Sequence, residues 1–246
     1  MRNLKITIEY DGTNYAGWQI QKRHKKKTIQ QTIEQALAKI LQENVKLVGS
    51  GRTDAGTHAL GQVANFKTNS KLKLNNISRG LNSILPVDIR IKSICNAPLD
   101  FHARFSARSK HYRYTIVNQP FLSPQLRHFS YLVKCPLDIE KIKRAAVYLL
   151  GRHNLRSFQA VDKVNRDAVR TIQSLKVSRK GKAIQFDIAA DGFLYKMVRN
   201  IVGTLIEVGR GKIKPEDIPR ILAAKSRVDA GPCAPAKGLC LIRVKY

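Results

Sequence analysis

The chain has 246 residues, of which 43% are hydrophobic, so it can bury a core as one large domain or as two closely joined halves. Its 45 Lys and Arg outnumber 17 Asp and Glu, and the resulting net charge of +28 predicts a polyanionic partner. No apolar run reaches membrane-spanning length and no segment has the pattern of a signal peptide, which disfavours a membrane and leaves nucleic acid as the expected partner.

The first part of the chain predicts several strands and one helix. Residues 4–10 alternate apolar and polar side chains, as a half-buried strand does. Thr28 is placed to cap a helix over 29–42, whose apolar residues form one stripe. Further strands are expected at 45–49, 61–67, 87–94 and 111–117.

The second part follows an irregular, proline-containing segment at 118–136, which predicts a division into halves 1–117 and 118–246. A helix is expected over 138–151, with Asp138 as its cap and Gly151 as its end. The other expected elements are strands at 169–178, 183–189 and 238–244, a strongly apolar helix at 193–209 and a short helix from Pro215. Antiparallel strands mixed with helices in each half predict an α+β fold rather than a doubly wound one.

The cysteines and histidines lack the patterns that bind metals. Cys95, Cys135, Cys233 and Cys240 are scattered, with no CxxC pair. The six histidines show no i, i+4 arrangement. We therefore expect no metal and no cofactor, and a reducing cytoplasm is the favoured compartment.

The segment VGSGRTDAGTHALGQ at 48–62 places one carboxylate, Asp54, in a loop of small residues. A phosphate-cradling loop is a weak match, because Asp54 occupies the third glycine position and no helix follows. In a second interpretation Asp54 is a turn residue that caps its own backbone. In a third, small residues admit RNA, Arg52 binds phosphate and Asp54 acts as nucleophile or base. Local chemistry leaves the second and third interpretations open.

Five segments, in order, resemble one known family. GRTDAGTHA at 51–59 is similar to the motif GRTDAGVHA of the TruA family of tRNA pseudouridine synthases, with Thr57 in place of the usual valine. The other four are YDGTNYAGWQ, FHARFSARSKHYRYTI, FLYKMVRNIVGTLIEVG and AGPCAPAKGLCLIRV. The resemblance spans residues 4–244, and the segment at 153–171 is a looser match.

The resemblance implies an isomerase that detaches uracil from its ribose and rejoins it through C5, at nucleotides 38, 39 and 40 of the tRNA anticodon stem-loop. Asp54 is then the catalytic aspartate, Tyr112 stacks on the target base, Arg199 pairs with Asp54, and Arg52 helps to flip the base. No cofactor is implied. From the residues alone, Tyr112 also fits an ordinary strand core and Arg199 fits the solvent face of a helix.

The resemblance also implies a fold and partners. The fold has two similar halves that form one extended, mostly antiparallel sheet flanked by helices, with the catalytic cleft between them. Family members form homodimers, and one tRNA contacts both subunits. The expected tRNA contacts are Phe101, His102, Arg104, Phe105, Lys163 and Arg166.

Three alternative functions remain at this point. The first is the same chemistry at other tRNA uridines, and the second is a non-catalytic tRNA-binding protein. The third is a metal-free ribonuclease that uses His58 and His102 as acid and base. Retention of Asp54, Tyr112 and Arg199 together argues against the second.

Overall fold

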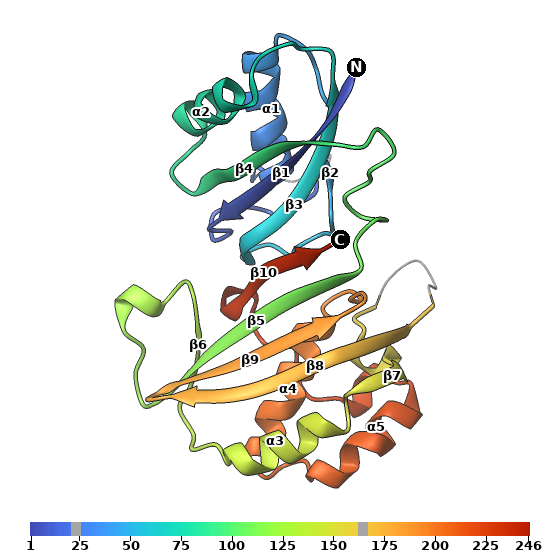
Figure 1. Ribbon diagram of the computed structural model, residues 1–246. Coiled ribbons are helices and arrows are strands. Elements are labelled where there is room, and N and C mark those ends of the chain that lie inside the picture. Colours follow the sequence, from blue (N-terminus) through green and yellow to red (C-terminus); the bar gives the residue numbers. More distant parts are fainter. Residues whose placement is uncertain (21–25, 162–166) are drawn as a thin grey trace. The chain divides into compact units, whose positions relative to one another are not determined.

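The computed structural model describes residues 1–20, 26–161 and 167–246 (Figure 1). The chain forms two compact units, residues 1–108 with 240–246, and residues 109–239. This division differs from the expected one at 117/118, which falls inside strand β5 (Ser109–Asn118). The strand cannot be split there because it pairs with β9 (Ala183–Ala190) along its length.

The first unit is a sheet with the strand order β4–β1–β3–β10. Its central pairs are antiparallel, whereas β10 runs parallel to β3. The helices α1 and α2 pack against each other beside the sheet (Figure 1). The bounds are β1 Arg2–Tyr10, α1 Ile29–Leu41, β2 Val48–Gly49, β3 His58–Thr68, α2 Leu74–Ile84, β4 Ile89–Ala97 and β10 Leu239–Lys245.

Local sequence signals predicted β1 and α1 correctly. Leu4, Ile6 and Ile8 are fully buried, as the alternation in β1 requires, and each contributes about 1.5–3 kcal/mol by leaving water. The Thr28 side chain accepts a hydrogen bond from the Gln31 N–H, which confirms the predicted helix cap.

Other boundaries in the first unit were wrong. The expected strand at 45–49 is reduced to the two residues of β2, and β3 begins earlier than expected. Helix α2 was missed because only Ile77 and Leu81 of its residues are buried, which leaves too short an apolar stripe to recognise. Lys73, the residue that precedes its first turn, also makes no side-chain capping bond, so the usual start signal is absent.

The second unit is an antiparallel sheet with the strand order β5–β9–β8–β7, and β6 pairs parallel to β5. Its remaining bounds are β6 Tyr131–Val133, α3 Ile139–Val147, β7 Gly151–Asn154, β8 Val169–Lys180, α4 Met197–Gly209 and α5 Ile218–Ala224. Single 3-10 turns cover Pro124–Leu126, Arg156–Phe158, Pro215–Asp217, Arg227–Asp229 and Ala236–Gly238.

Two helices of the second unit are shorter than predicted. Helix α3 is capped by Asp138 as expected but ends at Val147, and Gly151, with φ +93°, begins β7. Helix α4 begins at Met197 because Lys196 is left-handed, with φ +57°, and a helix cannot extend back through it.

The predicted α+β class is confirmed, since each unit packs helices against mainly antiparallel strands. Helix α4 is mainly apolar, and every residue in it except Arg199 is buried, including the polar Asn200, Thr204 and Glu207. No helix among residues 1–20, 26–161 and 167–246 is both long and apolar enough to cross a membrane.

Candidate functional site

The loop that carries Asp54 is fixed at its start by a buried glutamine. Ser50 donates through its N–H to the Val63 carbonyl (2.8 Å) and through its hydroxyl to Gln62 Oε1 (2.6 Å). The Gln62 amide donates to the Gly51 carbonyl (3.0 Å). Because Gln62 belongs to β3, the loop leaves the sheet in a defined direction.

The middle of the loop is held by Tyr10, the last residue of β1, and by Trp18 further along the chain. The Trp18 N–H donates to the Thr53 carbonyl (3.1 Å), and the Thr53 hydroxyl lies 2.8 Å from the Tyr10 hydroxyl. Burial raises the pKa of Tyr10, so its phenol stays protonated at neutral pH. The carbonyl and the hydroxyl of Thr53, the residue before Asp54, are therefore both hydrogen-bonded.

Two glycines between Tyr10 and Trp18 allow this stretch of backbone to approach the loop closely. A Cβ on Gly17 (φ +92°) would stand 2.5 Å from the Thr53 carbonyl oxygen and 3.0 Å from the Asp54 carbonyl carbon. A Cβ on Gly12 would stand 2.0 Å from the Thr57 carbonyl oxygen. Only glycine fits in either place, so the segment can lie against the loop on both sides of Asp54.

Asp54 itself lies in a turn, where its carbonyl accepts from the Thr57 N–H (3.1 Å) and Gly56 has φ +75°. The turn interpretation is therefore correct for the backbone, and it is compatible with a chemical role for the carboxylate. Asp54 is half-buried and Arg52 is exposed, so the loop offers an anionic and a cationic group to a ligand.

His58 has a structural environment. It is buried, its Nδ1 accepts from the Gly12 N–H (3.2 Å), and the same atom lies 3.1 Å from Asp11 Oδ1. His102 Nδ1 accepts from the backbone N–H groups of Arg104 and Phe105, each at 3.2 Å. These contacts disfavour the ribonuclease hypothesis, because a buried and engaged His58 is poorly placed to exchange protons with RNA.

Three of the predicted tRNA contacts form an exposed cluster of rings and charge. The His102 and Phe105 rings stack with centroids 4.3 Å apart, and the Arg104 guanidinium lies 5.5 Å from the Phe105 ring centroid. Phe105 is 77% exposed. Such a cluster suits stacking on an unpaired base, because a flat ring and a delocalised cation both interact with its face.

The segment 98–103, which leads into this cluster, is anchored to the sheet by residues that the sequence did not single out. Asn3 donates to the carbonyls of Pro98 (2.8 Å) and Phe101 (2.9 Å). Asn65 donates to Asn3 Oδ1 (3.0 Å) and accepts from the Ala103 N–H (2.8 Å). These bonds hold residues 98–103 in place without any local sequence pattern.

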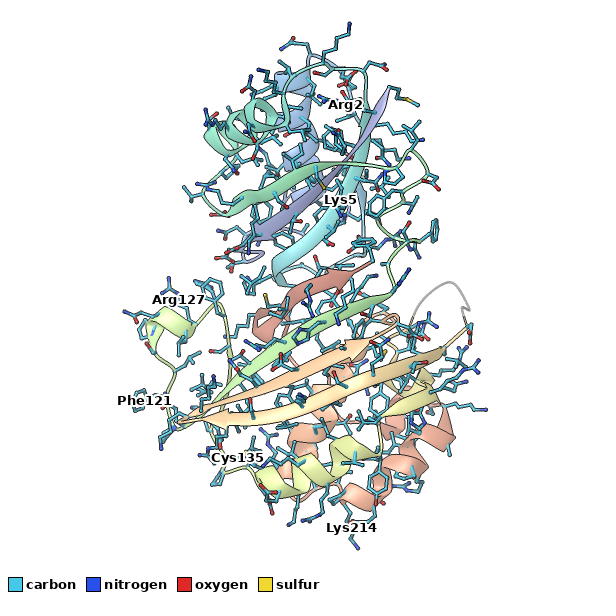
Figure 2. The ribbon with its side chains drawn as sticks, viewed as in Figure 1. Arg2, Lys5, Phe121, Arg127, Cys135 and Lys214 are labelled. Carbon is cyan, nitrogen blue, oxygen red and sulfur yellow. The ribbon has the colours of Figure 1, made fainter. Side chains whose placement is uncertain are left out.

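Phe101 also anchors this segment from within. Its ring lies 4.9 Å from the Tyr246 ring, and the Lys5 ammonium lies 5.6 Å from the centroid of each. Lys5 is labelled in Figure 2. The Tyr246 hydroxyl donates to the Ala103 carbonyl (2.8 Å). Phe101 therefore supports the cluster rather than sharing its exposure.

The second unit holds Tyr112 and Arg199. Tyr112, in β5, is 7% exposed and meets the Phe193 ring edge-on, with centroids 4.9 Å apart. Arg199, in the first turn of α4, donates from Nε to the Ala234 carbonyl (2.7 Å). Arg199 is thus held by the fold rather than free on a helix surface. The other two predicted contacts, Lys163 and Arg166, lie outside the described residues.

Within the described part of the chain, no three or more His, Cys, Asp or Glu side chains gather where they could hold a metal ion.

The chain matches the model of a family described as tRNA pseudouridine synthase over residues 6–106 and 145–246. It is 51% identical over 246 residues to the tRNA pseudouridine synthase A of Acetivibrio thermocellus, covering 100% of both chains. It is 48% identical over 243 residues to that of Moorella thermoacetica, covering 99% of each. The corresponding values for Caldicellulosiruptor bescii are 47% over 246 residues and 100% of both.

These matches cover the candidate residues unequally. Asp54 and Arg199 lie inside the ranges matched by the family model, whereas Tyr112 lies in the unmatched stretch 107–144. The individual relatives align across that stretch as well. The interpretation of Tyr112 therefore depends on full-length relatives.

Replacing Gly17 with Ala should lower the free energy of unfolding by about 3 kcal/mol or more, because the new Cβ meets the Thr53 carbonyl in an already left-handed backbone. Gly181→Ala is the matched control, since Gly181 is also left-handed (φ +58°) but faces open space, and about 1 kcal/mol is expected there. Urea unfolding measures both, and equal losses would contradict the close approach.

Two threonines that flank Asp54 should respond oppositely to valine. The Thr57 hydroxyl is buried and has no hydrogen-bond partner among the described residues, so Thr57→Val should raise the free energy of unfolding by about 1 kcal/mol. Thr53→Val removes the bond to Tyr10 and should lower it by about 1–2 kcal/mol. Thermal unfolding tests the pair, and a loss at Thr57 would show that its hydroxyl is satisfied.

Proposed function

The chain belongs to the tRNA pseudouridine synthase family, and on that premise we propose that it converts uridine to pseudouridine at nucleotides 38, 39 and 40 of the tRNA anticodon stem-loop. The isomerase class and the tRNA substrate follow from the family. The nucleotide positions rest on the resemblance of the sequence motifs, and the residue roles rest on those motifs together with the site geometry.

The reaction is an isomerisation that needs one well-placed anionic group. The bond between C1′ and N1 breaks, the uracil turns, and C5 bonds to C1′. C5 then loses its proton and N1 gains one, so no atom enters or leaves overall. A carboxylate beside the ribose can stabilise the electron-poor C1′ or accept a proton. Asp54 supplies this carboxylate.

The observation that carries the proposal is the fixed, half-buried position of Asp54. The preceding residue, Thr53, is bonded through its carbonyl to Trp18 and through its hydroxyl to Tyr10. The following turn closes through the Thr57 N–H. A reactive group held in this way loses little entropy when the substrate arrives, which favours catalysis over a purely structural turn.

Three further side chains serve the same reaction. Tyr112 stacks on the target base and compensates the stacking that the base loses when it leaves the helix. Arg52, which is exposed, contacts the nucleic acid as the base is turned out. Arg199 supplies a fixed positive charge to the reaction. The hydrogen bond from Arg199 Nε to the Ala234 carbonyl holds the guanidinium in place, which supports this role of Arg199.

The whole chain binds tRNA through charge, and the cluster of His102, Arg104 and Phe105 adds base stacking. A net charge of +28 favours phosphate contacts, so binding weakens steeply as salt rises. The protein works in the cytoplasm as a homodimer; the tRNA substrate supports the compartment and the family resemblance supports the dimer.

Asp54→Asn should abolish pseudouridine formation, with a loss of at least about a thousandfold, because the amide can neither attack nor accept a proton as a carboxylate does. Mass spectrometry measures the product in transcripts with a uridine at only one of nucleotides 38, 39 and 40. tRNA affinity should stay within about twofold of wild type.

The charge control is Glu140→Gln, which neutralises an exposed carboxylate on α3 and should leave turnover unchanged. An active Asp54→Asn variant would overturn the role of Asp54. Product at other uridines alone would overturn the proposed positions, and bound but unmodified tRNA with the wild type would favour a non-catalytic binding protein.

Phe105→Ala should weaken tRNA binding by about 5- to 100-fold, because one base loses its stacking partner. Val87→Ala is a matched control, since Val87 is 83% exposed but apolar without a ring, and no change is expected. Filter binding at fixed salt measures both dissociation constants. Equal affinities for the two variants would show that the exposed cluster does not contact tRNA.

A further inference from the structure

The segment 231–235 lies directly against the first turns of α4. The Gly231 N–H donates to the Thr204 hydroxyl (2.9 Å), and the Ala234 N–H donates to the Arg199 carbonyl (3.1 Å). A Cβ on Gly203 would stand 1.6 Å from the Pro232 carbonyl oxygen. At Gly203 the helix thus presents bare backbone to this segment, and the two stretches of backbone touch without a side chain between them.

This contact sets the orientation of Arg199. The Ala234 carbonyl accepts from Arg199 Nε at 2.7 Å, so any shift of the segment moves the acceptor that orients the guanidinium. Arg199 is also the one residue of α4 that is not buried. Its orientation therefore depends on where residue 234 lies.

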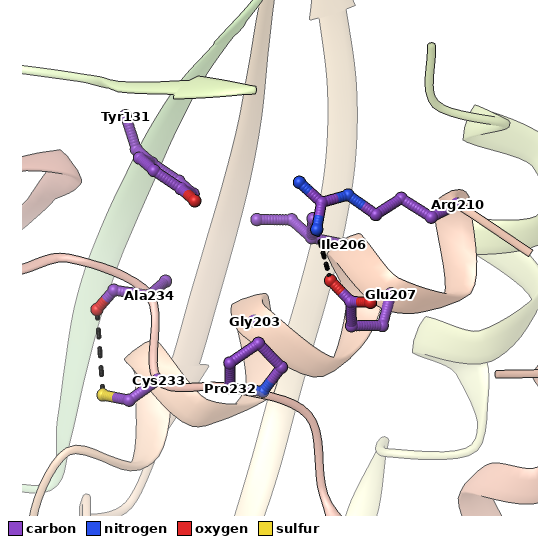
Figure 3. Close-up of a pocket in the computed structure, with 8 residues that line it drawn as sticks. All are labelled: Tyr131, Gly203, Ile206, Glu207, Arg210, Pro232, Cys233 and Ala234. Atoms are coloured by element: carbon purple, nitrogen blue, oxygen red, sulfur yellow. Dashed lines mark hydrogen bonds and ion pairs between the residues drawn. The ribbon is translucent and has the colours of Figure 1, made fainter. Parts of the chain in front are cut away.

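One side of the segment borders a cavity. This cavity has a volume of about 60 Å³ and is lined by Tyr131, Gly203, Ile206, Glu207, Arg210, Pro232, Cys233 and Ala234, which are the residues drawn in Figure 3. Hydrogen bonds hold the segment at Gly231, Ala234 and Pro235.

At one end that bond comes from Tyr114. The hydroxyl of Tyr114 donates to the Pro235 carbonyl (2.7 Å), and the side chain is fully buried in β5. A Cβ on Gly238 would stand 2.6 Å from the Tyr114 ring, so the ring and the following turn are in close contact. Burial raises the pKa of Tyr114, which keeps the hydroxyl protonated as the donor.

We propose that Tyr114 is a positioning residue for Arg199, acting through the Pro235 carbonyl and the adjoining Ala234 carbonyl. Thr204 anchors the other end of the segment through Gly231. The inference rests on the proposed function, because it assumes that Arg199 serves the isomerisation. It gives the Tyr114 hydroxyl a role, whereas the local sequence indicates only that Tyr114 is an inward-facing strand residue.

Tyr114→Phe removes the hydroxyl that donates to the Pro235 carbonyl, next to the Ala234 carbonyl that accepts from Arg199. It should lower kcat by about three- to tenfold while KM for tRNA stays within twofold, because the lost bond positions Arg199 and does not bind tRNA. Tyr131→Phe is the matched control. Tyr131 borders the same cavity, and its hydroxyl makes no hydrogen bond within the described parts of the chain, so kcat should not change.

Thr204→Val is the second variant and releases the opposite end of the segment. It should lower kcat in the same direction, which keeps the test valid if Tyr114→Phe folds poorly. In an Arg199→Ala background, Tyr114→Phe should add less than a twofold loss, because there is no guanidinium left to position. Multiplicative losses would overturn the inference.

A spectroscopic readout separates this inference from the proposed function. In ¹⁵N-labelled protein without tRNA, the Arg199 Nε–H signal, assigned by its loss in Arg199→Lys, should exchange faster in Tyr114→Phe and as in wild type in Tyr131→Phe. Unchanged exchange in Tyr114→Phe would refute the positioning role. Normal turnover of Arg199→Ala would instead refute the catalytic role of Arg199, whatever the exchange shows.

Discussion

The contact between residues 12–17 and the loop 53–57 is the constraint on which the candidate site depends. The two stretches of backbone meet because Gly12 and Gly17 carry no Cβ, and hydrogen bonds with Trp18 and Tyr10 fix Thr53 in the space that results. A loop of small polar residues would otherwise sample many conformations. Residues 12–17 follow β1 and the loop 53–57 precedes β3, and these two strands are paired in the sheet. The contact therefore fixes the position of Asp54 relative to the sheet.

The second unit uses the same physical device at another place. There a helix glycine, Gly203, lets the segment 231–235 lie on α4, and a buried tyrosine hydroxyl bonds its last carbonyl. In each unit a buried phenol holds the chain next to a candidate functional side chain, Tyr10 near Asp54 and Tyr114 near Arg199. Buried phenols suit this task because burial raises the pKa of both and keeps them neutral.

Affinity and chemistry are assigned to different parts of the surface. The net charge of +28 attracts any polyanion and carries little sequence information. The exposed cluster of His102, Arg104 and Phe105 is the proposed stacking surface for an unpaired base, and its support by Asn3 and Asn65 gives it a fixed place. In the proposed function, the chemistry is assigned to Asp54, which lies outside this cluster.

The sequence by itself determined the elements whose signals are local. Alternation predicted β1, β4 and β5, a threonine cap predicted the start of α1, and a contiguous motif singled out Asp54 as the candidate catalytic residue. Local signals failed for α2, whose apolar stripe is short, and for the first turn of α4, where one left-handed residue sets the boundary.

Tertiary structure alone decided which residues hold the site in place. Asn65 and Asn3 are 62 positions apart, and Tyr114 and Pro235 are 121 apart, so no periodicity or spacing connects them. Within its own segment, none of these residues stands out by its type or its spacing. Their roles exist only because folding brings a donor to a particular carbonyl or amide oxygen, which is a property of three-dimensional distance and not of sequence order.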